Sequence, residues 1–140
     1  MALRRFALIF GIVFLILGVG GFIPAMVAPH THPDVTVTTG LGLELSTFPI
    51  NVLHNIVHLL FGVWGLLAAR SGAGASGYAK AVAIVYALLT VMGLIPALRL
   101  HTTFGLVPLY GNDIWLHALL AIVAGYFGFV HRREEAVRAA

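Results

Sequence analysis

The sequence has no cysteine and very few charged residues. Only 9% of its 140 residues are Asp, Glu, Lys or Arg, whereas 60% are hydrophobic. A soluble domain carries about 25% charged residues, so this chain has too few to solvate a surface, and we expect an integral membrane protein in contact with a lipid bilayer. Without cysteine, disulfides, thiolate metal sites and cysteine nucleophiles are excluded. With only three methionines besides, a metal site would be built mainly from imidazole and oxygen donors.

The chain has four apolar segments, each close to the roughly 20 residues that span a bilayer. They predict an all-α polytopic four-helix bundle in a single domain, residues 1–140. The first segment follows two arginines, as a signal peptide does, but it is longer than a typical signal core, and we expect a retained transmembrane helix. The expected helices cover residues 6–26, 49–69, 78–98 and 112–130.

The connections between these segments differ in character. Pro49 suits the first turn of the second helix, and the small residues 71–77 predict a tight connection before the third. The first outer loop, residues 29–47, is long and polar. Its alternating residues on both sides of Thr39-Gly40 predict a short β-hairpin or a lid.

Basic residues mark one end of the expected helices. With four helices both termini lie on one side, and the positive-inside rule assigns this side to the cytoplasm. Only Arg99 falls on the other side. The pI of 9.8 does not indicate a nucleic-acid partner, because the basic residues are scattered at segment ends. Those on the cytoplasmic side are Arg4, Arg5, Arg70, Lys80, Arg132, Arg133 and Arg138.

Histidine gathers at the opposite, outer end. His54 and His58 stand one helical turn apart on one face, with Cβ atoms about 5–6 Å apart, and Asn51 and Asn55 share that face. Such side chains are costly in hydrocarbon unless something satisfies them, so we expect the face to point inward. Of the seven histidines only His131 is cytoplasmic; the outer six are His30, His32, His54, His58, His101 and His117.

The two halves of the sequence resemble each other. Residues 21–24 (GFIP) end the first helix, and residues 93–96 (GLIP) end the third. This predicts two hairpin repeats in the same orientation, related by a pseudo-two-fold axis along the membrane normal. Asp113 and His117 on the fourth helix then face the second helix, with Thr90 within reach of His58. The matching proline–histidine pairs are Pro49 with His58 and Pro108 with His117.

Two segments also resemble a known family. They are residues 49–62 (PINVLHNIVHLLFG) and 104–117 (FGLVPLYGNDIWLH), and the opening residues 4–8 (RRFAL) are similar as well. Over nearly its whole length the chain resembles the bacterial membrane family catalogued as domain of unknown function 4383, and more loosely the DoxX-like four-helix proteins. The resemblance implies a small four-helix protein of the bacterial cytoplasmic membrane, and it supplies no catalytic residue.

Three interpretations of the outer polar cluster stay open. A metal site would use His54, His58, His117 and Asp113, a donor set that suits zinc, copper or iron. A b-type haem held by His58 and His117 would leave the His54–His58 pair unexplained. A polar network could instead bond internally and fix the helix register. The supporting residues in each case are Asn51, Asn55, Tyr86, Thr90 and Asn112.

These patterns favour an outward-facing metal-binding membrane protein, with a redox-associated role as one option. No nucleophile–base–oxyanion arrangement is visible, which favours a non-enzymatic protein and leaves open whether a bound ion catalyses a reaction. The alternatives are an accessory or scaffold subunit of a larger membrane complex, and a proton or solute path that would require a homo-oligomer. Taken alone, the loop histidines His30, His32 and His101 are expected to be solvated, although they could close the site or deliver metal to it.

Overall fold

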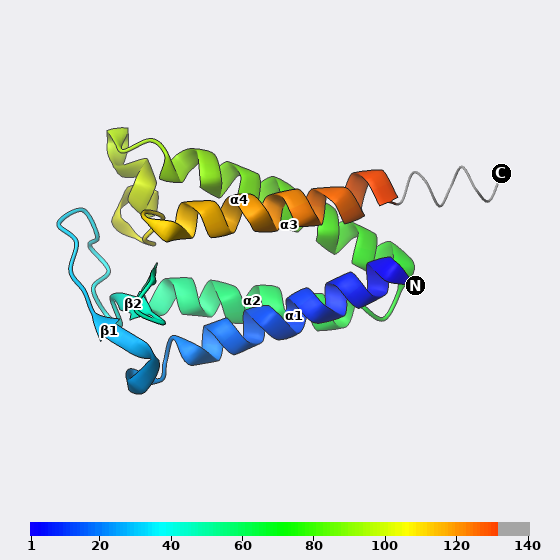
Figure 1. Ribbon diagram of the computed structural model, residues 1–140, viewed down its shortest axis with the longest axis horizontal. Helices are drawn as coiled ribbons and strands as arrows, with labels where there is room; N and C mark the ends of the chain where they lie inside the picture. The colour runs from blue at the N-terminus through cyan, green and yellow to red at the C-terminus, as the bar shows by residue number, and fades with distance from the viewer. Residues whose placement is uncertain (132–140) are drawn as a thin grey trace.

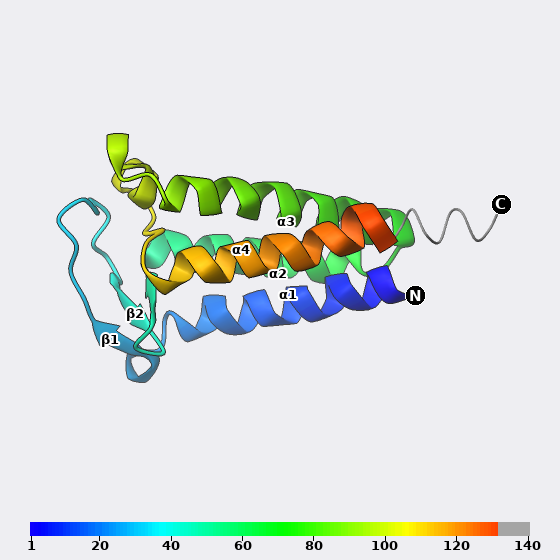
Figure 2. The ribbon, with the colours of Figure 1, turned by 45° about the horizontal axis from the view of Figure 1, so that its top comes forward.

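The computed structural model describes residues 1–131, and this part of the chain is mostly helical. Its helices run along one common axis, and a small sheet with irregular loops gathers at the end opposite the N-terminus (Figures 1 and 2). The α-helices are α1 (Ala2–Gly20), α2 (Val52–Ala68), α3 (Gly72–Gly93) and α4 (Asn112–Gly125), which the π-helical segment η3 (Tyr126–His131) continues. Two 3₁₀ segments, η1 (Pro24–Met26) and η2 (Ala97–Gly105), lie in the loops.

The helices have the length and composition of membrane spans. Three of them, Ala2–Gly20, Gly72–Gly93 and Asn112–His131, are long and apolar enough to cross a membrane, with 19, 22 and 20 residues. Helix α2 is equally apolar but has only 17 residues. Large apolar side chains such as Leu60 and Ile122 stay exposed at 64% and 70%. Lipid would cover such a surface, so the helices indicate a membrane protein.

Glycines bring α1 and α2 into backbone contact. A Cβ added to Gly11 would lie 2.8 Å from the amide nitrogen of Leu66 and 2.9 Å from the carbonyl oxygen of Gly62. One added to Gly65 would lie 2.7 Å from the Cα of Gly11. Small residues permit such approach between membrane helices. Gly18 lies in the same contact, since a Cβ added there would lie 2.9 Å from the amide nitrogen of Leu59.

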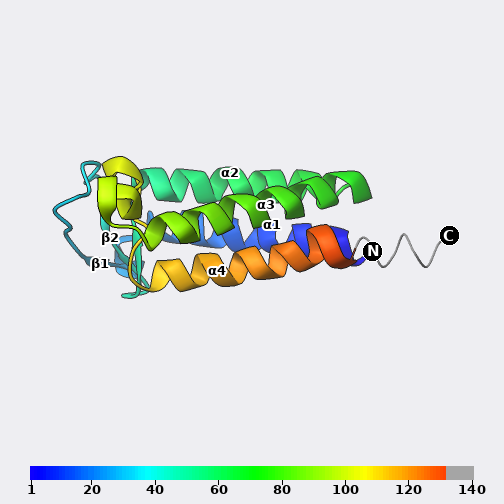
Figure 3. The ribbon, with the colours of Figure 1, turned by 90° about the horizontal axis from the view of Figure 1, so that it is seen from above.

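The second helix pair and the aromatic core complete the packing. Helix α3 packs along α4, while α2 packs mainly on α1 and α3. The axes of the four helices are roughly aligned, and α1 and α3 run opposite to α2 and α4 (Figure 3). Phe14 and Tyr86 are almost fully buried between the pairs, with ring centroids 5.5 Å apart. Tyr78 is also fully buried and donates to the Phe61 carbonyl at 3.2 Å.

The helix ends correct several sequence-based boundaries. Helix α1 covers residues 2–20 instead of 6–26, and α2 begins at Val52, because Pro49 lies in a strand and Asn51 caps the helix. Residues 71–77 were expected to form a connection, but α3 already begins at Gly72. The helix starts there because the Ser71 side chain accepts from the Gly74 amide and caps it. Arg132, Arg133 and Arg138 lie outside the described residues.

The first region between helices contains antiparallel β-structure, as expected, but its turn does not lie at Thr39-Gly40. The strands are β1 (Val27–Pro29), β2 (Gly42–Glu44) and β3 (Phe48–Ile50), antiparallel in the order β1-β2-β3. Residues 35–39 form no strand, because the amides of Thr36 and Val37 donate to the Gly105 carbonyl in the other outer loop, at 2.8 and 3.2 Å. The tight turn lies instead at residues 45–47, between β2 and β3.

A buried acid lies where the sheet meets the end of α1. Glu44 is 2% exposed, and its Oε1 has no hydrogen-bond partner in the described chain. Gly20 leaves room for this carboxyl, since a Cβ there would clash with Oε1. Burial raises the pKa of Glu44 to about 7. The folded protein therefore holds this proton to higher pH than the unfolded chain does.

The contact at Gly65 gives a test of helix packing. We expect Gly65→Ala to lower the free energy of unfolding by roughly 1–3 kcal/mol, because the added Cβ meets the α1 backbone. Gly77→Ala, also within a helix, is the matched control. A Cβ at Gly77 meets nothing within 4 Å, so helix propensity alone predicts a gain of up to about 1 kcal/mol. Unfolding in detergent measures both, and equal effects would contradict the packing.

Glu44 gives a test by pH. Its stabilising contribution is fully present below the unfolded pKa of 4.5 and is lost as pH rises through about 7. The expected slope reaches about 1.4 kcal/mol per pH unit between these values. Glu44→Gln should flatten this part of the stability profile and be the more stable form above pH 7. Parallel profiles of wild type and variant, from unfolding between pH 4 and 9, would refute the assignment.

Candidate functional site

Asn51 joins the first turn of α2 to both long outer loops. It is fully buried, and its Oδ1 accepts from the His54 amide at 3.0 Å, which caps the helix. Its Nδ2 donates to the Val37 carbonyl at 2.9 Å and to the Leu106 carbonyl at 2.7 Å. All hydrogen-bonding groups of this side chain are thus engaged. Asn51 is a structural residue, and no donor of it remains for a ligand.

The next turns of α2 present three further polar side chains to the interior. His54, Asn55 and His58 are 3%, 0% and 6% exposed. The rings of His54 and His58 lie 4.4 Å apart between centroids, as their one-turn spacing predicts. Phe14 of α1 packs on His58 at 5.7 Å. The inward direction expected for this face is what the structure shows.

Helix α4 supplies two further groups from its first turns. Asp113 and His117 are each 2% exposed, and Asp113 Oδ2 lies 3.5 Å from His117 Nε2. The two residues are one helical turn apart, so they share a face. Asp113 occupies the first turn of α4, where the helix dipole favours a negative charge. This position helps to accommodate a carboxylate at a buried site.

Residues from the two helices meet at this end. One ligand atom each from His54, Asp113 and His117 lies within 4.8 Å of the other two. The ring centroids of His54 and His117 are 6.0 Å apart, and the edge of Tyr86 packs on His117 at 4.9 Å. The ring of His58 packs against that of His54, but His58 is not one of the three residues whose ligand atoms converge. We call His54, Asp113 and His117 the inner cluster.

Several atoms of these side chains are buried and unpaired. Within the described residues, Nδ1 of each of the three helix histidines has no hydrogen-bond partner, and neither amide atom of Asn55 has one. Buried polar atoms are almost always bonded to protein or ordered water, and each exception needs an explanation. The atoms are His54 Nδ1, His58 Nδ1, His117 Nδ1, Asn55 Oδ1 and Asn55 Nδ2; Asp113 Oδ2 also has no hydrogen bond, although it lies 3.5 Å from His117 Nε2.

Three of the residues named as supporting do not act as expected. Thr90 donates to the Tyr86 carbonyl at 2.7 Å in its own helix, so its hydroxyl proton is not available to His58. Tyr86 contributes a ring that packs on Phe14 and His117. Asn112 is exposed at the start of α4. Phe14, which contacts His58, was not anticipated from its apolar segment.

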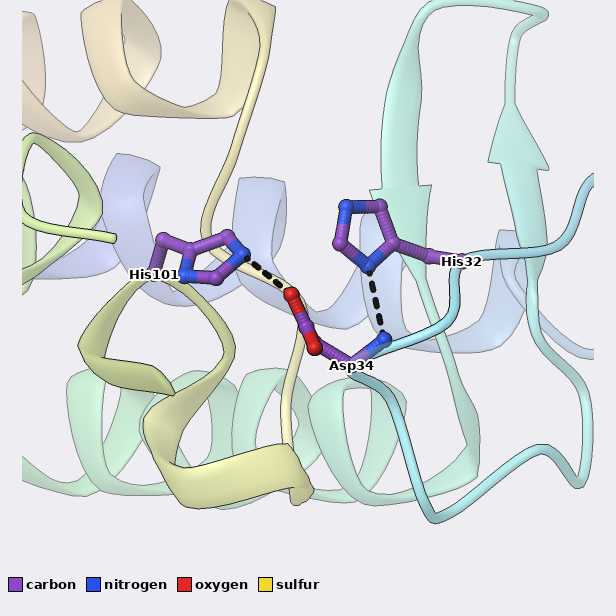
Figure 4. Close-up of side chains that lie close together, drawn as sticks. All are labelled: His32, Asp34 and His101. Atoms are coloured by element: carbon purple, nitrogen blue, oxygen red, sulfur yellow. Dashed lines mark hydrogen bonds and ion pairs between the residues drawn. The ribbon is translucent and has the colours of Figure 1, made fainter. Parts of the chain in front are cut away.

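A second group of polar side chains lies in the outer loops. His101 Nε2 is 3.3 Å from Asp34 Oδ2, and the Asp34 amide donates to His32 Nδ1 at 3.2 Å (Figure 4). One ligand atom each from these three residues lies within 4.8 Å of the other two. We call them the outer cluster. Sequence reasoning treated the loop histidines as solvated, because nothing local shows that residues 34 and 101 meet.

Aromatic and charged neighbours surround the outer cluster. Tyr110 stacks on His32 at 4.3 Å, and its hydroxyl lies 3.0 Å from His30 Nε2. Burial raises the pKa of Tyr110 to about 12, so the hydroxyl keeps its proton. Burial, followed by His101, lowers the pKa of His32, so its imidazole is neutral at pH 7. Arg99 Nε approaches Asp34 Oδ1 at 3.7 Å.

Asn51 and Ser71 offer a matched comparison of caps. Both cap a helix through a side-chain oxygen, but only Asn51 also binds two loop carbonyls. Ser71→Ala should cost about 0.5–2 kcal/mol of stability through the lost cap. Asn51→Ala should cost roughly 1–3 kcal/mol more, because two carbonyls lose their donor. Similar losses for the two variants in detergent unfolding would show that the loop bonds contribute little.

Comparison with known proteins gives one match. The family model described as Domain of unknown function (DUF4383) matches residues 4–130, which is nearly the whole chain and includes both clusters. No curated protein matches the sequence, and no solved structure matches it. The match confirms the resemblance carried by residues 49–62 and 104–117. The chain belongs to the DUF4383 family of proteins, whose function is unknown.

Proposed function

We propose that this protein is a multi-pass protein of the bacterial cytoplasmic membrane that binds a divalent metal ion at the inner cluster. His54, Asp113 and His117 would be the ligands, and His58 would be a fourth donor or a partner of His54. One observation carries the proposal: a carboxylate and two imidazoles from two helices converge with their donor atoms within 4.8 Å. All three residues are buried, where unligated polar groups are costly.

The donor set and spacing fit a metal ion of the zinc type. Atoms bound at about 2.0–2.2 Å to one ion lie roughly 3–4 Å from one another, so small side-chain rotations would complete the site. Two neutral imidazoles and a carboxylate suit zinc, copper or iron. Three protein ligands would leave a position for His58 or water. Such a site can polarise a bound group or hold an ion without catalysis.

A self-satisfied polar network explains the cluster less well. Such a network would use its own donors and acceptors, yet the Nδ1 atoms of His54, His58 and His117 have no partner in the described chain. A metal ion, or ordered water, would supply the missing interactions. An accessory role in a larger complex would not require the ligand atoms of His54, Asp113 and His117 to converge. The convergence of these ligand atoms, and not the packing of the helices, therefore carries the proposal.

Haem is the less favoured cofactor. A haem bound by His58 and His117 would need a macrocycle-sized space between the two imidazoles. In the structure, the ring of His54 lies 4.4 Å from His58 and 6.0 Å from His117. Tyr86 also packs on His117 at 4.9 Å. These rings occupy the space beside His58 and His117 that a haem macrocycle would need, whereas a single metal ion needs far less space.

The proposed orientation follows the basic residues. Arg4 and Arg5 begin α1, and Arg70 and Lys80 lie at the end of α2 and in the first turns of α3, all at the end of the molecule opposite the sheet (Figure 1). By the positive-inside rule this end faces the cytoplasm, so both termini would be cytoplasmic and the inner cluster would open to the outside.

The repeat and the four-helix bundle belong to the same proposal. The packing of α1 with α2 and of α3 with α4 supports two hairpin units in one domain. The two similar segments also lie in similar places, since residues 21–24 directly follow α1 and residues 93–96 include the last residue of α3. A pseudo-two-fold axis would bring α2 and α4 to corresponding positions, each with its polar groups in the outer turns.

Elemental analysis of the purified full-length protein tests the proposal. We expect about one transition-metal ion per chain to remain after extensive dialysis. Asp113→Asn, which is nearly isosteric, and His117→Ala should each weaken binding at least tenfold, since even supporting residues contribute about 10- to 100-fold to affinity. His131→Ala, at the end of η3 and far from the inner cluster, should bind as wild type does.

The outcomes separate the interpretations. A Soret band in the absorption spectrum would show that the bound cofactor is haem and not a single metal ion. Wild-type protein that retains no metal after supplementation with zinc, copper or iron would refute the proposal, and the water-filled network would then stand. Thermal unfolding of each variant shows whether a lost ion reflects a lost ligand or a lost fold. Retention of the ion by folded Asp113→Asn and His117→Ala would equally exclude this site.

A further inference from the structure

We propose that the outer cluster, His32, Asp34 and His101, is a second and exchangeable binding site for a divalent transition-metal ion. The site lies in the loops at the outer end of the molecule and shares no residue with the inner cluster. It does not rest on the proposed function, because its three donors are assembled by loop contacts alone. Zinc is the ion we would test first, since two imidazoles and one carboxylate suit it.

Two loops that are far apart in the sequence build the site together. Asp34 Oδ2 is 3.3 Å from His101 Nε2, and the rings of His32 and His101 lie 5.4 Å apart. In Figure 4 the imidazoles of His32 and His101 lie on either side of the Asp34 carboxylate. Short rotations would bring all three donors onto one ion. Water would fill the remaining positions, because Asp34 is 41% exposed.

The backbone beneath the cluster is fixed before any ion binds. Thr102 is fully buried, and its hydroxyl lies within hydrogen-bonding distance of the Asp34 carbonyl (3.3 Å) and of the Arg99 carbonyl (3.0 Å). The Thr36 amide and hydroxyl both donate to the Gly105 carbonyl at 2.8 Å. These bonds join the loop of Asp34 to the loop of His101. A preorganised frame lowers the entropy cost of ligand binding.

The hydrogen bond at His32 identifies the nitrogen that can bind an ion. His32 Nδ1 accepts the Asp34 amide at 3.2 Å, so it is the unprotonated nitrogen of the neutral ring, and an ion that binds there must displace this hydrogen bond. Tyr110 stacks on the same ring at 4.3 Å and limits its rotation. Nδ1 of His101 is buried and unpaired in the described chain, so its hydrogen bonding is incomplete.

Arg99 lowers the affinity that this site can have for a metal ion. Its Nε lies 3.7 Å from Asp34 Oδ1, the carboxylate oxygen that does not face His101. An ion must compete with this guanidinium for the charge of Asp34, and 46% of the Arg99 side chain is exposed. Binding should therefore be weaker than at a fully buried site and rapidly reversible. The alternative is that the cluster only holds the two loops together through the ion pair.

Zinc titration of the full-length, metal-stripped protein separates these alternatives. Equilibrium dialysis should show a weaker zinc equivalent in addition to any ion at the inner cluster. Asp34→Asn and His101→Ala should each weaken this equivalent at least tenfold. His30→Ala is the matched control: it removes a histidine of the same loop that lies outside the set of three, and it should leave zinc binding unchanged.

The inner cluster is tested separately in the same titration. In a His117→Ala background, one zinc should remain, and adding His101→Ala should abolish it. If the inner site fails but the outer one exists, wild type binds one zinc that depends on His101 and not on His117. The proposal is overturned if folded Asp34→Asn and His101→Ala bind zinc as wild type does. It is equally overturned if His30→Ala loses as much zinc as they do, or if wild type shows no weaker equivalent.

Discussion

The cost of an unbonded polar group in an apolar interior governs the outer end of this protein. Asn51 and Asn55 are both fully buried, and one helical turn separates them. Asn51 is bonded to two loop carbonyls and to the His54 amide, whereas both amide atoms of Asn55 are unpaired. The first side chain holds the structure, and the second lies with the histidines whose Nδ1 atoms are also unpaired. The same residue type thus has two roles, which its partners decide.

Close helix packing places this polar end. Gly11 and Gly65 let α1 and α2 touch through their backbones, which fixes how far α2 can rotate. A fixed rotation keeps His54 and His58 directed to the interior, where Phe14 and Tyr86 fill the space below them. Asp113 and His117 reach the same region from α4 although α2 and α4 share no extended packing. The inner cluster is therefore a meeting of side chains at the outer end, framed by helices that pack elsewhere.

Helical periodicity in the sequence predicted which polar side chains share a face. The alternating pattern in the outer loop did not predict which segments pair. The one-turn spacing of His54 and His58, and of Asp113 and His117, is a property of the helix itself, so their pairing follows from the sequence. The strand pairing does not, because the amides of Thr36 and Val37 donate to the Gly105 carbonyl and residues 35–39 form no strand with residues 41–45. Asp34 and His101 meet for the same reason, through contacts between loops separated by a whole helical hairpin. Ser71 started α3 earlier than its glycine-rich sequence indicated, because a cap outweighs the low helix propensity of Gly72 and Gly74.

The loop frame connects the two clusters through one side chain. Thr102 and Thr36 join the loops that carry Asp34 and His101, and Asn51 binds the same two loops at Val37 and Leu106. Asn51 also caps α2 three residues before His54. A shift of the loops would therefore move the cap and, with it, the first histidine of the inner cluster. Because a cap and its loop carbonyls can be satisfied together only in one arrangement, the position of His54 depends on the outer loops as well as on helix packing.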